Sequence, residues 1–412
     1  MVNEFLKTST NTHIIGIDRG ERNLLYLVMI DMEGNIKKQF SLNEIKNEII
    51  KGDQKIPIST NYHDLLIERA KDNNDARKNW QTIESIKELK EGHLSQAIHK
   101  ITKLMIENNA VIVLEDLNPG FIRSRQKREF QEYGKFERML ANKLQYLVDK
   151  KKDANEIGGV LNGFQLTNDI ESNKKYQEEL RYQNGFLFYV PAWNTSKIDP
   201  VTGVVNMLPL HEYRDDVCRF FEKFDTIRYN LEKDWFEFTF DYINFNKKVE
   251  GTQTKWTLCT YGERIETSKK NNQWNSEEVV LTDEFKKVFT EAEIDINGNL
   301  KEAICSLTKK KHLDELMHLM KLLLQMRNSK TGREIDYLLS PVADANGHFY
   351  DSREEIPSLP KDADANGAYN IARKGLWAIR KIQSTPSGEK LELAISNKEW
   401  LQFAQQKPYL DE

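Results

Sequence analysis

Two short apolar runs that each end in a carboxylate constrain the fold of this chain more than any other feature. Residues 13–18 read HIIGID and residues 110–115 read AVIVLE. Runs of this length, apolar throughout, are typical of buried strands. If the two strands pair in parallel, their carboxyl ends meet at one edge of the sheet, where open α/β sheets bind ligands. Asp18 and Glu115 are therefore candidate site residues.

The residues between these runs predict further strands and a helix. Leu24–Ile30 is a strongly apolar strand and Ile36–Phe40 a third one, and the short turns between them favour an antiparallel meander. From about Trp80 the apolar residues recur at helical spacing, and Gly92 marks a bend or a break between two helices. The positions that define this spacing are Ile83, Ile86, Leu94, Ile98, Ile101 and Met105.

Two more elements come after Glu115 and complete the expected core. Tyr133, Phe136, Leu140, Leu144 and Leu147 define a second amphipathic helix. Phe186–Val190 is a fifth strand, stopped by Pro191. The order of three strands, helix, strand, helix and strand predicts an α/β fold with a mixed sheet and flanking helices.

The sequence pattern changes between about residues 195 and 360. Short aromatic strands are expected at 236–240 and 255–258, and a helix at 313–326, so this stretch is interpreted as an insertion with its own small core. A C-terminal helix from Gly367 to Ile382 comes next, and Asp364 stands just before it.

Asp18, Glu115 and Asp364 together point to a metal site. Taken singly, a strand-ending Asp is usually a turn residue or a helix cap. Three clustered carboxylates repel one another unless cations lie between them. Mg²⁺ prefers oxygen ligands, Mn²⁺ suits the same ligands, and two such ions about 4 Å apart can drive phosphodiester hydrolysis.

Length and composition limit the classes of protein to which this chain can belong. The chain has 412 residues, which favours two domains, and its 39% apolar content supports packed structure. No apolar run approaches the ~20 residues of a membrane-spanning helix, so a cytoplasmic protein without a membrane partner is expected. Cys218, Cys259 and Cys305 are widely spaced and the histidines form no ligand motif, which argues against a disulfide framework and a zinc ribbon.

The net charge of −4 does not by itself suggest a nucleic-acid binder. Basic residues nevertheless cluster at 123–128, 150–152 and 309–312. Each cluster is either a solvated surface or a contact to a nucleic-acid backbone.

Several segments resemble one known family. IIGIDRGERNLLYLVMID, VIVLEDLNPGF and DADANGAYNIARKG are similar to the three RuvC motifs of type V-A CRISPR effector nucleases, the Cas-twelve-a (formerly Cpf-one) family. The segment at 76–101 resembles the family's bridge helix and the residues after it, with Trp80 as its anchoring tryptophan, for which a core position is expected over a base-stacking one. Segments around 185–230 and 323–353 resemble the surroundings of the family's Nuc insertion.

The resemblance implies an RNase H-like (RuvC) mixed sheet with an inserted α+β Nuc domain. It divides the chain into RuvC part I at 1–61, a bridge helix at 62–79, RuvC part II at 80–190, Nuc at 191–361 and RuvC part III at 362–412. Asp18, Glu115 and Asp364 fall on the family's catalytic, metal-binding carboxylates. Arg327, within QMRNS, falls on an arginine implicated in target-strand cleavage.

Arg327 has a second interpretation, an ordinary surface arginine paired with Asp336 or Glu334. The loop 118–129 is either a lid whose arginines meet DNA or a solvated loop.

The function implied by the resemblance is a Mg²⁺-dependent DNA endonuclease lobe of an RNA-guided effector from a bacterium or archaeon. It would cut both target strands and, once activated, single-stranded DNA. Guide RNA would be bound by an N-terminal portion that this chain lacks, and a monomer is expected. Two alternatives stay open: a non-catalytic docking lobe, and another RNase H-like nuclease such as a junction resolvase or an RNase H.

Overall fold

The computed structural model divides the chain into two compact units. It describes residues 2–19, 24–51, 54–82, 86–116, 127–145, 147, 153–155, 183–245, 252–270, 273–330 and 335–406. The first unit comprises Met1–Trp193 and Gly367–Ile395, and the second Asn194–Asn366 and Ser396–Glu412. No helix among the described residues is long and apolar enough to cross a membrane.

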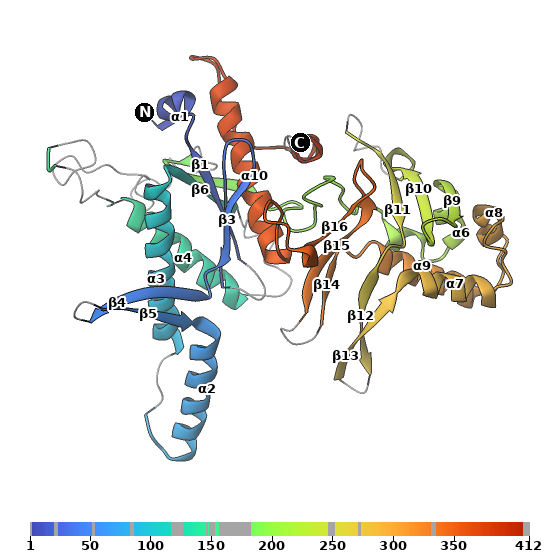
Figure 1. Ribbon diagram of the computed structural model, residues 1–412, viewed down its shortest axis with the longest axis horizontal. Coiled ribbons are helices and arrows are strands. Elements are labelled where there is room, and N and C mark those ends of the chain that lie inside the picture. Colours follow the sequence, from blue (N-terminus) through green and yellow to red (C-terminus); the bar gives the residue numbers. More distant parts are fainter. Residues whose placement is uncertain are drawn as a thin grey trace. The chain divides into compact units, whose positions relative to one another are not determined.

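A six-stranded mixed sheet, in the order β3-β2-β1-β6-β8-β7, forms the centre of the first unit (Figure 1). The antiparallel β1–β2–β3 meander and the parallel pairing of β1 with β6 are both confirmed. The parallel pair β6–β8 and the short antiparallel pair β7–β8 complete the sheet. The strands are β1 His13–Asp18, β2 Tyr26–Ile30, β3 Ile36–Ser41, β6 Ala110–Asp116, β7 Gln183–Asn184 and β8 Leu187–Pro191.

Helices cover both faces of this sheet because β1 and β6 are apolar on both sides. Alternate residues, such as Ile15 on β1 and Ile112 on β6, join one core with α3 (Ile86–Glu107) and α4 (Lys127–Gln145). The other face packs against α10 (Ala363–Ser384), where Gly375 lies against Val113. A short helix, α1 (Val2–Thr8), precedes the sheet.

Two expectations for this unit need correction, and one stretch has structure that the sequence analysis did not predict. The polar stretch after β3 folds into a hairpin, β4 (Glu44–Lys51) and β5 (Gln54–Asn61), followed by α2 (Tyr62–Lys78). Gly92 does not mark a break between two helices, because α3 runs through it without interruption. Trp80 is not a core residue: its side chain is 97% exposed in the turn after α2, where its φ of 55° is left-handed.

The second unit has a core dominated by phenylalanine. Phe236, Phe238 and Phe240 project from the middle strand of the sheet β11-β10-β9 and are fully buried. Alternation along β10 brings aromatic rings against neighbouring helices, as between Phe236 and Phe289. The predicted aromatic strands and the helix near 313 are therefore present.

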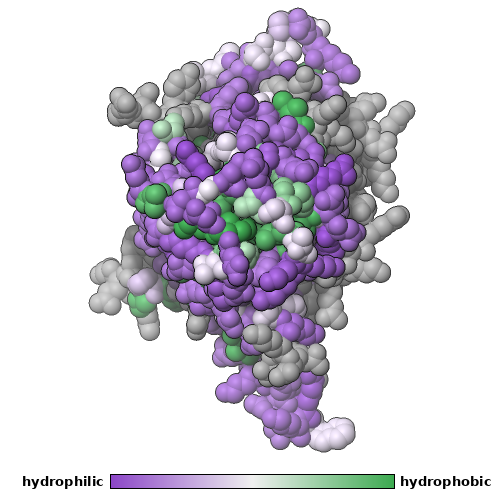
Figure 2. All heavy atoms as spheres, turned by 90° about the vertical axis from the view of Figure 1, so that its right-hand side faces the viewer, coloured by the Kyte–Doolittle hydropathy of each residue, from purple (hydrophilic) through white to green (hydrophobic). Residues whose placement is uncertain are grey.

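The elements of the second unit complete the chain. Its helices are α6 Val217–Glu222, α7 Leu281–Glu291, α8 Leu300–Cys305, α9 Lys310–Leu323 and α11 Asn397–Gln405, with short 3-10 turns at Leu210–Tyr213, Tyr242–Asn244 and Ser352–Glu354. Its strands are β9 Phe224–Asn230, β10 Trp235–Asp241, β11 Lys255–Cys259, β12 Glu263–Lys270, β13 Gln273–Val280, β14 Arg327–Ser329, β15 Asp336–Ala343 and β16 Phe349–Asp351. The face in Figure 2 is mostly hydrophilic, with a hydrophobic area near its middle.

Candidate active site

Asp18 and Glu115 stand at the carboxyl ends of neighbouring parallel strands. The register of β1 and β6 pairs Gly16 with Val113, and each carboxylate lies two residues beyond that pair on its own strand. Residues two apart on a strand share a face. Because Gly16 and Val113 face α10, Asp18 and Glu115 project on the α10 side of the sheet.

Glycines allow α10 to approach the sheet at backbone distance. A Cβ on Gly16 would stand 2.1 Å from the carbonyl oxygen of Ala368, and a Cβ on Gly375 would stand 2.3 Å from Val113 Cγ2. A Cβ on Gly367 would stand 2.1 Å from Asp18 Oδ2. These positions exclude any side chain, and at Gly367 the Asp18 carboxylate occupies the place that a Cβ would take.

Asp364 occupies the first turn of α10 and is 3% exposed. The expectation that it stands before the helix is corrected, since α10 begins at Ala363. Asp362 caps the helix by accepting the backbone N–H of Ala365 at 2.7 Å. Burial raises the pKa of Asp362 to about 6, and the charges of Asp364 and Asp336 add to this rise.

Arg327 lies in the second unit, where it pairs with Asp336. Its Nε and Nη2 donate to the two oxygens of Asp336 at 3.1 and 3.0 Å, a bidentate pair. The same Nη2 is 3.8 Å from Asp364 Oδ1. The expected partner Asp336 is thus confirmed, Glu334 lies outside the described residues, and the guanidinium also stands beside a predicted site carboxylate.

Lys374 is a functional candidate that the sequence patterns missed. Its side chain is buried, and Nζ donates to the carbonyl oxygens of Pro191 at 2.6 Å and Trp193 at 2.8 Å. Burial lowers the pKa of Lys374 to about 7, and the negative charge of Glu115 opposes that shift. A lysine two turns after Gly367, on the apolar side of a helix, was the available signal.

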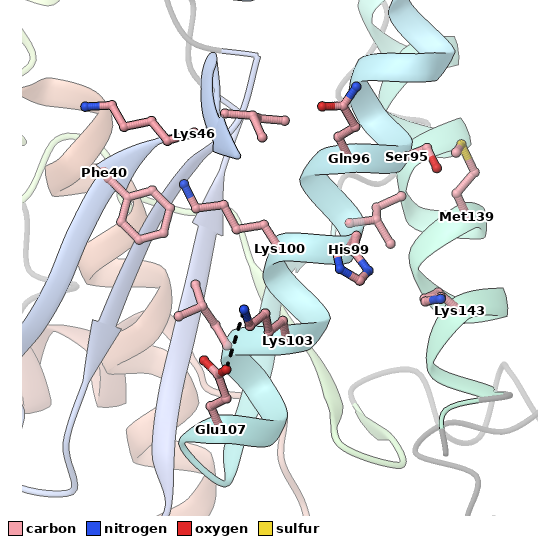
Figure 3. Close-up of a pocket in the computed structure, with 13 residues that line it drawn as sticks. Phe40, Lys46, Ser95, Gln96, His99, Lys100, Lys103, Glu107, Met139 and Lys143 are labelled. Atoms are coloured by element: carbon pink, nitrogen blue, oxygen red, sulfur yellow. Dashed lines mark ion pairs between the residues drawn. The ribbon is translucent and has the colours of Figure 1, made fainter. Parts of the chain in front are cut away.

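A basic cavity of about 640 Å³ lies on the other face of the same sheet, between β3, β4, α3 and α4 (Figure 3). Lys46, Lys100, Lys103 and Lys143 line it, and Glu107 is the only acidic group among the described residues of its wall. Lys100 Nζ stands 4.4 Å above the ring of Phe40, and burial lowers the pKa of this lysine. Such a cavity suits an anionic group, but it is separate from the carboxylates on the α10 side.

Two of the basic clusters fall largely outside the described residues. These are the cluster at 123–128, of which only residues 127 and 128 are described as the start of α4, and the lysines at 150–152. The loop 118–129 likewise lies outside the described residues up to residue 126. The cluster at 309–312 lies at the start of α9.

The comparison with known families agrees with this geometry. The family model of the RuvC nuclease domain matches residues 1–409, nearly the whole chain. That domain has an RNase H-like fold, and the mixed sheet with helices on both faces agrees with it. Its members hydrolyse nucleic acid and generally depend on divalent metal ions. This chain belongs to the RuvC nuclease family.

Proposed function

We propose that this chain is the DNA-cleaving lobe of an RNA-guided CRISPR effector of type V-A, with Asp18, Glu115 and Asp364 as its catalytic carboxylates. The observation that carries the proposal is the placement of Asp18 and Glu115 side by side at the carboxyl ends of β1 and β6. Asp364 and Gly367 are three residues apart on α10 and therefore share a helix face. Gly367 is the residue that lies against Asp18.

The donor set fits two Mg²⁺ ions, or Mn²⁺ in their place. All three proposed ligands are carboxylates, which hard divalent ions prefer. A Cβ at position 367 would overlap Asp18 Oδ2, so glycine lets this carboxylate lie against the backbone of α10. The ligand type favours hydrated metal ions as the partners of these carboxylates.

When bound, the ions would supply a water nucleophile at neutral pH and stabilise the leaving oxygen of the phosphodiester. Asp18 and Glu115 would fix the ions because their backbones belong to the rigid centre of the sheet. Lys374 would act as a positioning residue, since it holds the carbonyls of Pro191 and Trp193 at the end of β8, the strand that pairs with β6. Arg327 would neutralise a phosphate oxygen while Asp336 holds its guanidinium plane.

DNA is the proposed substrate, as target strands and as single strands after activation. The four lysines of the cavity in Figure 3 offer a backbone contact on the opposite face of the sheet. Guide RNA would be bound by a part of the effector outside these 412 residues.

Cleavage of a fluorophore–quencher single-stranded DNA by the purified chain in Mg²⁺ tests the proposal. We expect Asp18→Asn, Glu115→Gln and EDTA each to abolish the signal, with a loss of roughly 10³-fold for each variant. Glu33→Gln, a change at an exposed turn carboxylate, should cleave like the parent.

A metal-binding measurement distinguishes a nuclease that is inactive on its own from a non-catalytic docking lobe. Mn²⁺ titration followed by electron paramagnetic resonance should show bound ions that are lost when Asp18 and Glu115 are changed together. A double variant that binds as many Mn²⁺ ions as the parent would contradict the proposed site. A parent chain that binds Mn²⁺ but cleaves only when the guide-binding portion is added in trans supports the lobe assignment. Preference for an RNA–DNA hybrid would favour an RNase H-type enzyme instead.

A further inference from the structure

A second cluster of metal-ligand side chains lies in the second unit and shares no residue with the proposed hydrolytic site. Glu291 is the last residue of α7, and His312 and Glu315 are three residues apart near the start of α9. Their ligand atoms all lie within 4.8 Å of one another. Residues 291 and 312 are far apart in the sequence, so packing of the two helices creates the cluster.

Two atoms of this cluster are buried without a hydrogen bond. The side chain of His312 is only 6% exposed, and its Nδ1 has no partner. Glu315 Oε2 is likewise buried and without a hydrogen-bond partner, and it stands 3.8 Å from Nδ1. This separation is too long for a hydrogen bond, so a desolvated nitrogen and a desolvated oxygen face each other unsatisfied.

A shared cation would satisfy both atoms. Nitrogen and oxygen ligands lie about 2.0–2.2 Å from zinc, so two ligands of one ion stand at most about 4.3 Å apart. The 3.8 Å between His312 Nδ1 and Glu315 Oε2 falls within this limit. Glu291, whose side chain is 42% exposed, has the freedom to close the remaining distance.

Lys311 occupies the other carboxylate oxygens. Its Nζ is 3.1 Å from Glu291 Oε2 and 3.6 Å from Glu315 Oε1, and its side chain is 68% exposed. The ammonium therefore leaves Oε2 of Glu315 and Nδ1 of His312 to another ligand. It also competes with a cation for the charge of Glu291, and an exposed lysine can swing away.

We propose that Glu291, His312 and Glu315 bind one transition-metal ion, with Zn²⁺ as the ion that suits this ligand set best. An imidazole nitrogen with two carboxylates favours Zn²⁺ over Mg²⁺, which prefers oxygen ligands alone. Three protein ligands and a water complete a tetrahedron. The ion ties the end of α7 to the start of α9, and it is independent of the proposed hydrolytic site.

The test is Zn²⁺ binding by the full chain, measured against a chromogenic chelator in excess Mg²⁺. The described residues hold a second possible metal cluster, Cys218, Glu222 and Cys305, so all variants carry Cys218→Ser and Cys305→Ser. We expect one Zn²⁺ per chain. His312→Ala should weaken binding by more than the roughly 10–100-fold that loss of an outer-shell partner costs.

His318→Ala is the matched control, because this histidine lies on the same helix but pairs with Glu266 at 3.0 Å. It should bind Zn²⁺ like the parent. Lys311→Met should tighten binding, because it removes the competing ammonium. Saturating Zn²⁺ should raise the melting temperature of the parent and leave that of His312→Ala unchanged.

The proposal is overturned if the parent binds no Zn²⁺, or if His312→Ala and His318→Ala bind it equally well. Glu291→Gln keeps the test decisive should His312→Ala fail to fold, since Glu291 is exposed at a helix end. This variant should also weaken binding, and unchanged affinity would exclude the site as described.

Discussion

A methyl group on Gly367 would overlap the carboxylate of Asp18. The Cβ position of this glycine lies 2.1 Å from Asp18 Oδ2 and 2.8 Å from its Cγ. Such contacts cannot persist, so Gly367→Ala must displace either the carboxylate or the helix. We expect cleavage to fall by roughly 10²-fold or more, since misplacement of catalytic groups by about 1 Å has that effect. Steady-state cleavage with the folded variant, checked by circular dichroism, measures it.

Gly92→Ala is the control for Gly367→Ala. Gly92 is also within a helix, but nothing among the described residues lies within 4 Å of its Cβ position. The change should raise the free energy of unfolding by about 1 kcal/mol through helix propensity and leave cleavage unchanged. Equal cleavage by both alanine variants would refute the close-approach argument.

Lys374→Met should destabilise the first unit. The change removes the donor from the buried contacts to the carbonyls of Pro191 and Trp193, and unsatisfied buried groups cost about 1–3 kcal/mol each. Chemical denaturation followed by circular dichroism measures this loss. Lys374→Arg should not restore stability fully, because a planar guanidinium is larger than the ammonium. A methionine variant as stable as the parent would contradict the assigned role.

Arg327→Ala should slow cleavage by roughly 10²-fold while leaving Mn²⁺ affinity nearly unchanged. Asp336→Asn should slow cleavage less than Arg327→Ala does, because it removes one of the two oxygens that accept hydrogen bonds from the guanidinium. Single-turnover cleavage and metal titration on the same samples separate the two effects.

The Arg353–Asp351 pair provides the comparison for Arg327. Arg353 also contacts both oxygens of its aspartate, with Nε–Oδ1 at 3.0 Å and Nη2–Oδ2 at 2.6 Å. Arg353→Ala should lower stability without slowing cleavage. If both arginine variants cleave equally well, Arg327 is only a structural residue.

Asp199 gives the second unit a defined pH dependence. It is fully buried, its Oδ1 accepts the N–H groups of Val201 and Thr202 at 2.7 Å, and burial raises its pKa above the usual 3.8. Between the usual pKa and the raised one, the folded state therefore keeps a proton that the unfolded state has lost. Stability should fall as the pH rises from about 3.8 to the raised pKa, and stay constant above it.

Asp199→Asn removes this dependence because the amide keeps the acceptor oxygen and cannot ionise. Melting temperatures should exceed those of the parent at about pH 7.5 and approach them at about pH 4. Asp344→Asn is the control, since Asp344 accepts two turn N–H groups nearer the surface. A parent and an Asp199→Asn variant with parallel pH profiles would show that Asp199 stays charged in the fold.

Local patterns predicted the centre of the first unit well. The apolar runs at β1 and β6 are recognisable because a strand that is buried on both faces must be apolar at nearly every position. Their parallel pairing was the condition under which Asp18 and Glu115 would meet at one edge of the sheet, and the structure shows this pairing. The three segments of helical spacing also became α3, α4 and α10.

Tertiary contacts explain what the patterns missed. The polar β4–β5 hairpin lacks the alternation that marks a half-buried strand. Trp80 looked like core because of its side chain, yet a left-handed turn exposes it. The close approach of Gly367 to Asp18 joins residues about 350 positions apart, and the His312 cluster joins two helices, so neither has a local signature.

The path of the chain between the two units bears on how this protein can be recombined. The chain passes from one unit to the other after Trp193, after Asn366 and after Ile395. The second of these crossings, after Asn366, lies within the first two turns of α10. Inserting one residue between Asp364 and Gly367 would rotate the aspartate by about 100° around the helix. Chimeras that exchange residues 194–361 should therefore be joined before Asp362, so that Asp364 and Gly367 keep their spacing on α10.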